Sequence, residues 1–469
     1  MMLKVTYPAG AESERLYIFD VMFREFLGLD YLASAGLGDC TIVEMLGTSP
    51  GRSVIISDQL LGSVSENWLE ERSIPGSPAR AMLIGPALAP NALPESLPAF
   101  FGEAENSEFA VTASKDAIHI YLEIFGLAFY MLSRYEEAVL SVRDEHGRFP
   151  SQQAMVVKEN YHHRAIVNEY VELLWAALVT QWPSLTRKPL KYSLDISHDV
   201  DEPFCTLRQP LLSVARSAMG DIVKRRSISL SMARCSSYVT SFAGDFEHDP
   251  ANSFDFIMGL SERLGAQSTF NFLSGRTNVK YDSKYELTDA PVEQLLARIS
   301  ERGHQIGYHG SYDSGTHPDV IMSEASRLRD TCRNMDIHQT DFGGRQHYLR
   351  WWNPVTWRAW EAAGLTFDSS LGFSDRVGFR CGTCYEYPVY DVRERRALRL
   401  RERPLIAMDI GALREAGWDH EVAFDLLITM WRECRKYNGC FTLLWHNNRL
   451  MARADKEFYA SLVGALGNL

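Results

Sequence analysis

The sequence predicts an α/β protein made of a smaller N-terminal domain and a larger C-terminal domain built on parallel strands. The chain has 469 residues, which exceeds the size of one ordinary core. A stretch with two prolines, QWPSLTRKPL at 181–190, separates two patterned regions. After this stretch, short apolar strands alternate with amphipathic helices. We therefore predict domains at residues 1–187 and 188–469.

The N-terminal domain mixes both kinds of periodicity. Apolar runs rich in β-branched residues predict strands at Thr41–Met45 and Ser53–Ser57. Apolar residues at spacings of three and four predict helices at Leu16–Leu29, Ala117–Ala138 and Ile166–Trp182. This domain is therefore α/β or α+β, and its polar residues form no evident catalytic cluster.

The C-terminal domain repeats a strand–helix unit. The predicted strands are Tyr192–Ile196, Ser268–Phe272, Gln305–Tyr308, Thr366–Asp368, Leu405–Asp409 and Phe441–Trp445. The predicted helices are Ser253–Leu264, Pro291–Arg302, Val320–Met335, Pro354–Ala363 and Glu421–Lys436. Such repeats form a (β/α) barrel or an open parallel sheet, and in barrels the chemistry sits at the carboxyl ends of the strands. Residues 205–252 interrupt the alternation, which predicts a helical insertion.

Composition and charge exclude several classes of protein. The formal charge of −12 argues against nonspecific binding to nucleic acid or to an anionic membrane, although a local basic site is not excluded. The N-terminus lacks a basic start followed by an apolar run, so we expect no signal peptide and a cytoplasmic location. The most apolar stretch, Ile118–Leu132, contains Glu123 and is too short to span a bilayer, so we expect no stable membrane insertion. Cys381 and Cys384 form a lone C-x-x-C pair, which we interpret as structural. The sequence leaves the oligomeric state open.

The strongest polar motif is Asp199-Val-Asp201, directly after the first predicted strand of the C-terminal domain. In extended backbone, residues two apart point the same way, so both carboxylates share one side. Like charges repel, and a bound cation relieves this, which leaves one carboxylate free to act as a base. A solvated turn or a helix cap is the alternative interpretation.

Further polar motifs follow other predicted strands. They are His309 and Asp313 in GYHGSYD, Arg345 and His347 in GGRQHY, Asp368 in FDSS, and His446 in LLWHNN. Histidine and aspartate bind zinc-like ions, arginine holds a carboxylate, and a strand-end histidine suits a general acid. Each motif alone is as readily explained by packing or by a turn. Their convergence at strand exits favours a catalytic centre.

The order of these motifs resembles that of the NodB-homology polysaccharide deacetylases, and most closely their WbmS-like branch. The supporting phrases are HDVDEP, GYHGSYDS, GGRQHYLRWWNPVTW, FDSSLGF, GFRCGTC and LLWHNN, which span about residues 190–450. LEIFGLAFYMLSRYEE and HGRFP resemble the uncharacterised domain that precedes the catalytic domain in that branch. The resemblance implies a distorted (β/α) barrel that uses a divalent metal to hydrolyse acyl groups on sugars.

The resemblance also implies a division of labour. Asp199 corresponds to the catalytic base, and Arg345 would hold it in place. His446 corresponds to the general acid, and Asp368 would tune it. Asp201 corresponds to the aspartate metal ligand.

His309 corresponds to the first metal histidine, and the usual second histidine, four residues later, is replaced by Asp313. Asp313 is therefore the expected third ligand, with His317 and His347 as rivals. A site with more oxygen ligands is less selective for zinc, so cobalt, manganese and nickel are alternatives. Tyr348, Trp445 and His347 are expected to contact the substrate.

We therefore expect a metal-dependent hydrolase that removes an acetyl or formyl group from an acylamino sugar. The substrate would be a nucleotide- or lipid-linked precursor in surface-polysaccharide biosynthesis. One alternative is a catalytically silent sugar-binding or scaffold protein, which the departure at Asp313 favours. Another is a hydrolase of a non-sugar amide that uses the same machinery.

Overall fold

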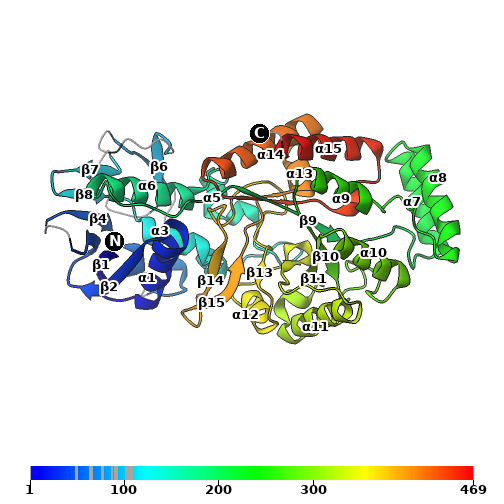
Figure 1. The fold of residues 1–469 in the computed structure, drawn as a ribbon, viewed down its shortest axis with the longest axis horizontal. Helices are drawn as coiled ribbons and strands as arrows, with labels where there is room; N and C mark the ends of the chain where they lie inside the picture. The colour runs from blue at the N-terminus through cyan, green and yellow to red at the C-terminus, as the bar shows by residue number, and fades with distance from the viewer. Residues whose placement is uncertain are drawn as a thin grey trace.

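A computed structural model describes residues 2–47, 51–62, 67–74, 79–85, 88, 93–100 and 109–467. Two sheets dominate the molecule, and they lie next to each other along its long axis (Figure 1). Buried residues from both regions belong to one continuous hydrophobic core. Within the described part of the chain, no helix is both long enough and apolar enough to cross a membrane.

The N-terminal sheet has six strands in the order β2-β1-β3-β4-β8-β7. Their bounds are β1 Met2–Pro8, β2 Asp30–Gly36, β3 Cys40–Met45, β4 Ser53–Ser57, β7 Val111–Ala113 and β8 Ala117–Ile120. A separate pair is formed by β5 (Arg80–Leu83) and β6 (Ser96–Ala99). The two strands predicted in this region are confirmed as β3 and β4.

Helices pack on this sheet, and one predicted helix is wrong in part. The longer helical elements are α1 Glu12–Phe19, the π-helix η1 Asp20–Leu27, α3 Ile124–Leu132, α4 Tyr135–Val139 and α6 Ile166–Gln181. The predicted helix Ala117–Ala138 begins as a strand, because Ile118 and Ile120 are buried while β8 pairs in parallel with β4. The predicted helix Ile166–Trp182 is confirmed as α6.

The C-terminal sheet has nine strands in the order β14-β15-β13-β12-β11-β10-β9-β17-β16. Their bounds are β9 Ser193–Val200, β10 Ser268–Leu273, β11 Gln305–Gly310, β12 Gly344–Gln346, β13 Phe367–Asp368, β14 Tyr387–Asp391, β15 Arg396–Glu402, β16 Ala407–Met408 and β17 Cys440–Leu444. All pairs are parallel except β14 with β15. The sheet curls into part of a barrel, and its edge strands β14 and β16 do not pair with each other in the described structure. All six strands predicted for this domain are present.

Helices cover this curled sheet. They are α9 Phe254–Arg263, α10 Ala290–Glu301, α11 Pro318–Asn334, α12 Val355–Ala362, α13 Asp409–Glu415, α14 His420–Lys436 and α15 Arg453–Gly467. The five predicted helices are confirmed as α9, α10, α11, α12 and α14. The predicted insertion forms the helical hairpin α7 (Leu211–Val223) and α8 (Ile228–Thr240), which projects from the end of the molecule (Figure 1).

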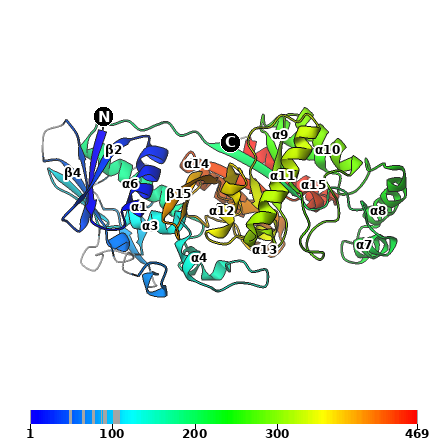
Figure 2. The ribbon, with the colours of Figure 1, turned by 90° about the horizontal axis from the view of Figure 1, so that it is seen from below.

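A buried ion network ties the N-terminal region to the barrel. Glu137 accepts hydrogen bonds from Arg134 at 3.0 Å and from Arg380 at 2.6 Å. All three side chains are buried, and Arg134 also donates to the backbone oxygen of Arg380. The chain then runs on from α4 along the barrel, as Figure 2 shows. The motifs SRYEE and GFRCGTC therefore meet in space.

Candidate active site

Most of the candidate residues lie at the carboxyl edge of the curled sheet. Asp199 is the second-last residue of β9, and Asp201 is the first residue after that strand. His309 lies in β11, in register with Arg345 of β12. His446 follows β17, the other neighbour of β9. Parallel strands end at one edge, so these side chains meet in a cavity of about 700 Å³.

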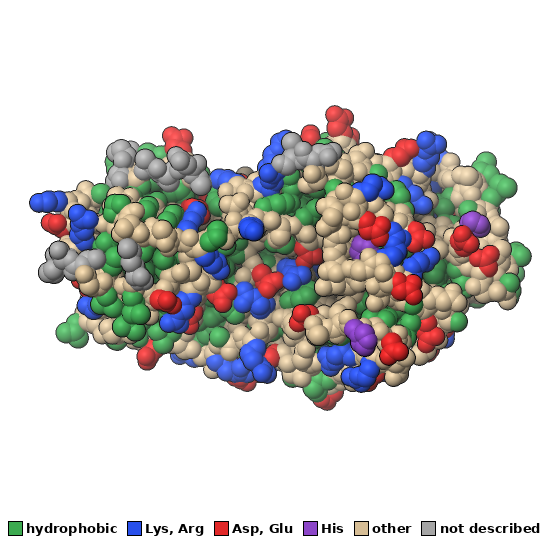
Figure 3. Space-filling view, in the orientation of Figure 1, with side chains coloured by type: hydrophobic (Ala, Val, Ile, Leu, Met, Phe, Trp, Pro, Cys, Tyr) green, Lys and Arg blue, Asp and Glu red, His purple; other side chains and the backbone are tan. Residues whose placement is uncertain are grey.

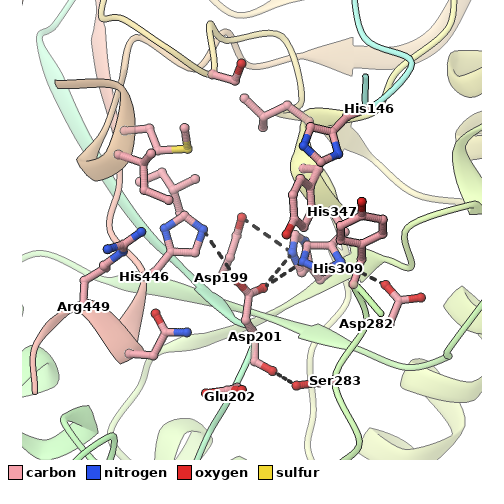
Figure 4. Close-up of a pocket in the computed structure, with 18 of the residues that line it drawn as sticks. His146, Asp199, Asp201, Glu202, Asp282, Ser283, His309, His347, His446 and Arg449 are labelled. Atoms are coloured by element: carbon pink, nitrogen blue, oxygen red, sulfur yellow. Dashed lines mark hydrogen bonds and ion pairs between the residues drawn. The ribbon is translucent and has the colours of Figure 1, made fainter. Parts of the chain in front are cut away.

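Asp201, His309 and His347 form a group that can hold a metal ion. Their ligand atoms all lie within 4.8 Å of one another. The Oδ1 atom of Asp201 is 3.4 Å from the Nε2 atom of His309 and 3.4 Å from the Nε2 atom of His347. Figure 4 shows the three side chains turned toward one another, with Asp199 and His446 beside them. One carboxylate oxygen and two imidazole nitrogens are a ligand set that zinc accepts.

The two imidazole rings are held from behind. The Nδ1 atom of His309 lies 3.0 Å from the backbone oxygen of Arg345, and that of His347 lies 2.9 Å from Oδ1 of Asp282. Each bond fixes the ring orientation and leaves Nε2 to face Asp201, as is usual for metal-binding histidines. Sequence reasoning missed Asp282, because it lies in a loop far from His347 in the chain.

The hydrogen-bond inventory of this group fits a metal site. Oδ1 of Asp201 and Nε2 of His309 are buried and have no hydrogen-bond partner in the described structure. Buried polar atoms are rarely left in this state, because desolvation without a partner costs free energy. His162, His163 and Glu415 form a second group of possible metal ligands among the described residues. There the Nε2 atom of His163 already has a partner, because it lies 3.2 Å from a carboxylate oxygen of Glu415. The residues present therefore fit a divalent cation at the Asp201 group.

The prediction of Asp313 as the third ligand is wrong in geometry. Asp313 accepts a hydrogen bond from Asn278 at 3.2 Å and lies 3.4 Å from Arg350. The chain enters a 3-10 turn, Ser314–Thr316, directly after Asp313, which carries this residue away from His309. His317 is exposed and bonds to the backbone of Asp313, whereas the rival His347 lies in one group with Asp201 and His309.

Asp199 is buried and held in its charged form. It accepts hydrogen bonds from Arg345 at 3.0 Å and from Asn271 at 2.8 Å. Burial alone would raise the pKa of the Asp199 carboxyl, but Arg345 and the nearby histidines outweigh it and hold the pKa below the usual 3.8. Its free Oδ2 atom lies 3.8 Å from Nε2 of His309, so an ionised carboxylate borders the ligand group. The predicted pairing of Arg345 with Asp199 is confirmed.

His446 is paired with Asp409, and the predicted pairing with Asp368 is wrong. Nδ1 of His446 lies 2.9 Å from Oδ1 of Asp409, and its backbone N–H donates to Oδ2 at 3.0 Å. Burial favours the neutral ring, but Asp409 outweighs it and raises the pKa of His446 to about 9. Asp368 lies on β13, which four strands separate from β17, and accepts hydrogen bonds from Ser370. Burial raises the pKa of the Asp368 carboxyl.

The prediction that Trp445 contacts substrate is also wrong. Its indole is buried and packs against Phe458 and Tyr459, with ring centroids 5.7 Å and 5.0 Å away. Its backbone oxygen lies 2.8 Å from Nδ1 of His198, a buried ring whose pKa is lowered by burial to about 4. His198 and Trp445 are therefore buried packing residues of the sheet and do not line the cavity.

The N-terminal region contributes one wall of the cavity. Tyr348, a predicted substrate contact, lines the cavity, and so do His146 and Arg148 from the HGRFP motif. Nδ1 of His146 lies 2.9 Å from the hydroxyl of Tyr312, and its ring is 4.8 Å from that of Tyr348. Arg148 donates to the backbone oxygen of Tyr348 at 3.2 Å. An aromatic wall therefore stands beside the ligand group, and part of it comes from residues outside the barrel.

The two cysteines of the C-x-x-C pair are not among the residues that line this cavity. Cys381 and Cys384 are both buried and are free thiols. Burial raises the pKa of the Cys381 thiol to about 12, which disfavours a reactive thiolate. Their structural interpretation agrees with these surroundings.

Comparison with known proteins gives limited matches. Residues 3–183 match the model of a family of unknown function, DUF7033, over less than half of the chain. No curated protein sequence matches. A candidate polysaccharide deacetylase from Mycobacterium smegmatis aligns at 15% identity over 60% of this chain and 86% of its own, with a TM-score of 0.37. Agd3, described as a novel carbohydrate deacetylase, aligns at 9% identity over 96% of this chain and 79% of its own, with a TM-score of 0.34. At these TM-scores neither likeness carries an activity over to this chain.

Proposed function

We propose that this chain is a metal-dependent hydrolase that removes an N-acyl group, acetyl or formyl, from an acylamino sugar. One observation carries the proposal: a ligand group with unsatisfied buried atoms lies between a held carboxylate, Asp199, and a carboxylate-paired histidine, His446. Binding alone requires neither an ionised base nor a protonated acid. Their presence in one cavity therefore favours catalysis over the silent sugar-binding alternative.

Asp201, His309 and His347 would hold the cation, for which zinc suits the nitrogen-rich donor set. A divalent cation, when bound, makes water more acidic and polarises an acyl carbonyl. Asp199 would accept the proton of the attacking water, because Arg345 and Asn271 leave its Oδ2 atom free and hold the carboxylate in its charged form. The aromatic wall at Tyr348 would exclude bulk water from one side.

His446 would complete the reaction as the general acid. Its Nδ1–H donates to Asp409, and its Nε2 atom faces into the cavity, 3.9 Å from Oδ2 of Asp201. Protonated Nε2 would donate to the amine nitrogen as the carbon–nitrogen bond breaks, because an amine leaves poorly without a proton. The two proton carriers would thus act on opposite ends of the scissile amide.

The cavity lining contains both acidic and basic side chains, and four of the basic ones favour a phosphorylated substrate. Lys280, Lys284, Arg414 and Arg449 line the cavity, and none has a carboxylate partner within ion-pair distance among the described residues. Arg449 lies next to His446 in Figure 4. Ammonium and guanidinium groups bind phosphate strongly, and the fork of arginine does so in bidentate fashion. We therefore propose a nucleotide- or lipid-linked acylamino sugar as the substrate.

The proposal is tested by metal analysis followed by mass spectrometry. Protein purified without chelator would be incubated with acetylated and formylated amino sugars, in free, 1-phosphate and nucleoside-diphosphate forms. We expect loss of the acyl mass from at least one phosphorylated form, and loss of the reaction after metal removal. A protein that stays metal-free and is not activated by zinc, cobalt, nickel or manganese would contradict the proposal.

A further inference from the structure

The helical hairpin α7–α8 has an unusual distribution of apolar residues. Eight large apolar side chains on it, and Phe242 in the 3-10 turn that follows it, are between 42% and 80% exposed. The eight are Leu211, Leu212, Met219, Ile222, Val223, Ile228, Met232 and Val239. Among the apolar residues of α7 and α8, only Val214, Ala218 and Leu230 are buried. In Figure 3, hydrophobic side chains lie open at the end of the molecule where Figure 1 places the hairpin. A contiguous exposed apolar surface of this kind marks an interaction site.

The inward side of the hairpin holds polar groups instead. Arg234 donates to Asp221 at 2.7 Å, and both side chains are buried. Asp249 accepts hydrogen bonds from Thr206 and Ser237, each at 2.8 Å. In an ordinary amphipathic helix the apolar stripe faces the core. In this hairpin the larger apolar side chains face solvent instead.

The exposed residues follow helical spacing on each helix. On α7, Leu212, Met219 and Val223 are separated by seven and four residues, which places them on one face. On α8, Ile228, Met232 and Val239 repeat the spacing of four and seven. Each helix thus presents a continuous apolar stripe to solvent.

Basic residues accompany these stripes. Residues 211–242 contain five arginines and lysines against a single acidic residue, Asp221, in a chain of formal charge −12, and the exposed acidic residues Asp245 and Glu247 follow this segment. Within the described structure, Arg216, Lys224 and Arg226 have no ion-pair partner, and the latter two lie at the turn between the helices. On the face that Figure 3 shows, acidic and basic side chains are intermixed over the rest of the molecule.

We propose that the α7–α8 hairpin docks on the surface of a bilayer that contains anionic lipids. Exposed apolar stripes enter the boundary between headgroups and acyl chains, and neighbouring basic residues contact anionic headgroups. A second copy of the chain is a poorer occupant, because two-fold pairing would bring equal positive charges together. Docking is peripheral and requires no membrane-spanning helix.

Docking would also position the active site. Arg225, at the turn of the hairpin, is among the residues that line the catalytic cavity. A hairpin held on the membrane therefore keeps the mouth of the cavity near the headgroups. The docking itself does not depend on the hydrolase proposal and is measured without any substrate.

The test is co-sedimentation of the full-length, metal-loaded protein with vesicles. Vesicles of phosphatidylcholine alone are compared with vesicles that also contain phosphatidylglycerol. We expect binding to the anionic vesicles, with weakening at high salt. In Lys224→Gln/Arg226→Gln, binding should fall by about fivefold for each charge removed.

The apolar stripes are tested by Leu212→Gln/Met232→Gln/Val239→Gln. These side chains are exposed, so the thermal melting curve should be unchanged while vesicle binding is lost. Leu32→Gln/Leu37→Gln is the matched control, because both leucines are exposed, at 57% and 109%, and lie in the N-terminal sheet region. Equal binding by the triple variant and the wild type would overturn the proposal. Failure of the wild-type protein to co-sediment with either kind of vesicle would also overturn it. A dimer that the triple variant abolishes, without vesicle binding, would identify a second copy as the occupant and also overturn it.

Discussion

The pairing of His446 with Asp409 makes the pH dependence of the reaction a sharp test of the general acid. A general acid must be protonated, so turnover is expected to fall as pH rises through the pKa of His446. Asp409 raises that pKa to about 9 in the protein without metal, and Asp201 adds to the shift. A bound cation offsets the charge of Asp201, so we expect the alkaline limb of the wild-type profile between the ordinary value of 6.5 and about 9.

Asp409→Asn removes the largest support of the protonated ring. An opposite charge at this distance typically shifts a pKa by about one to three units, so the alkaline limb should move down in pH by about that amount. The asparagine oxygen still accepts a hydrogen bond, so the ring should stay in place. The assay is turnover as a function of pH on the identified substrate, with metal content measured in parallel.

Asp368→Asn is the matched control for this substitution. Asp368 is a buried carboxylate at another strand end, but it bonds to Ser370 and is remote from His446. Its variant should keep the wild-type alkaline limb. If the limb stayed in place in Asp409→Asn, or moved in Asp368→Asn, the assignment of Asp409 as the partner of the acid would be refuted.

Four other substitutions test the ligands, the base, the cationic lining and the contact between the two regions. His347→Ala should lower metal affinity by more than about tenfold, the scale seen for loss of even an outer partner, whereas Asp313→Ala should keep one metal per chain in elemental analysis. Asp199→Asn should lower turnover on the order of 10²-fold with metal content unchanged, and near-normal turnover would exclude it as the base. Arg414→Gln/Arg449→Gln should lower kcat/KM for a phosphorylated substrate, relative to its uncharged form, by about tenfold or more. The control Arg399→Gln/Arg453→Gln, whose side chains are 93% and 92% exposed, should keep the wild-type ratio of the two kcat/KM values. Glu137→Gln removes the negative charge that pairs with the buried guanidinium groups of Arg134 and Arg380, and it should lower the free energy of unfolding, measured by chemical denaturation, by about 3–5 kcal/mol. Glu145→Gln, on an 87% exposed side chain, should change the free energy of unfolding little.

Much of the fold could be predicted from periodicity, because local spacing reports which face of an element is buried. The six predicted strands of the C-terminal domain and its five predicted helices all exist. The strand β12 was missed because three residues, Gly344–Gln346, carry no readable alternation. Its glycine is required: Gly344 has a φ of 153°, and a Cβ atom there would lie 1.9 Å from the backbone oxygen of Tyr308. The glycine of the GGR motif therefore allows β12 to lie against β11.

The candidate site could be predicted only as far as strand ends identify it. Asp199, Asp201 and His309 were placed correctly, because each follows or ends an apolar strand. The partner of His446 was not, although Asp409 was placed at the end of a predicted strand. The order of strands in the sheet decides which ends are neighbours, and β16 lies beside β17 while β13 lies on the far side of β9. Sequence spacing contains no information on that order.

The predicted boundary at 187 and 188 divides the sequence but not the active site. The HGRFP motif belongs to the N-terminal region, yet His146 and Arg148 line the cavity of the candidate active site. The buried contact of Glu137 with Arg134 and Arg380 fixes the start of the segment that carries them. A barrel without this region would lose one wall of its cavity and expose Tyr312, which is buried in the structure, to solvent. The N-terminal region therefore forms part of the cavity, and we predict that changes in it alter which substrate is accepted rather than the chemistry proposed for the Asp201 group.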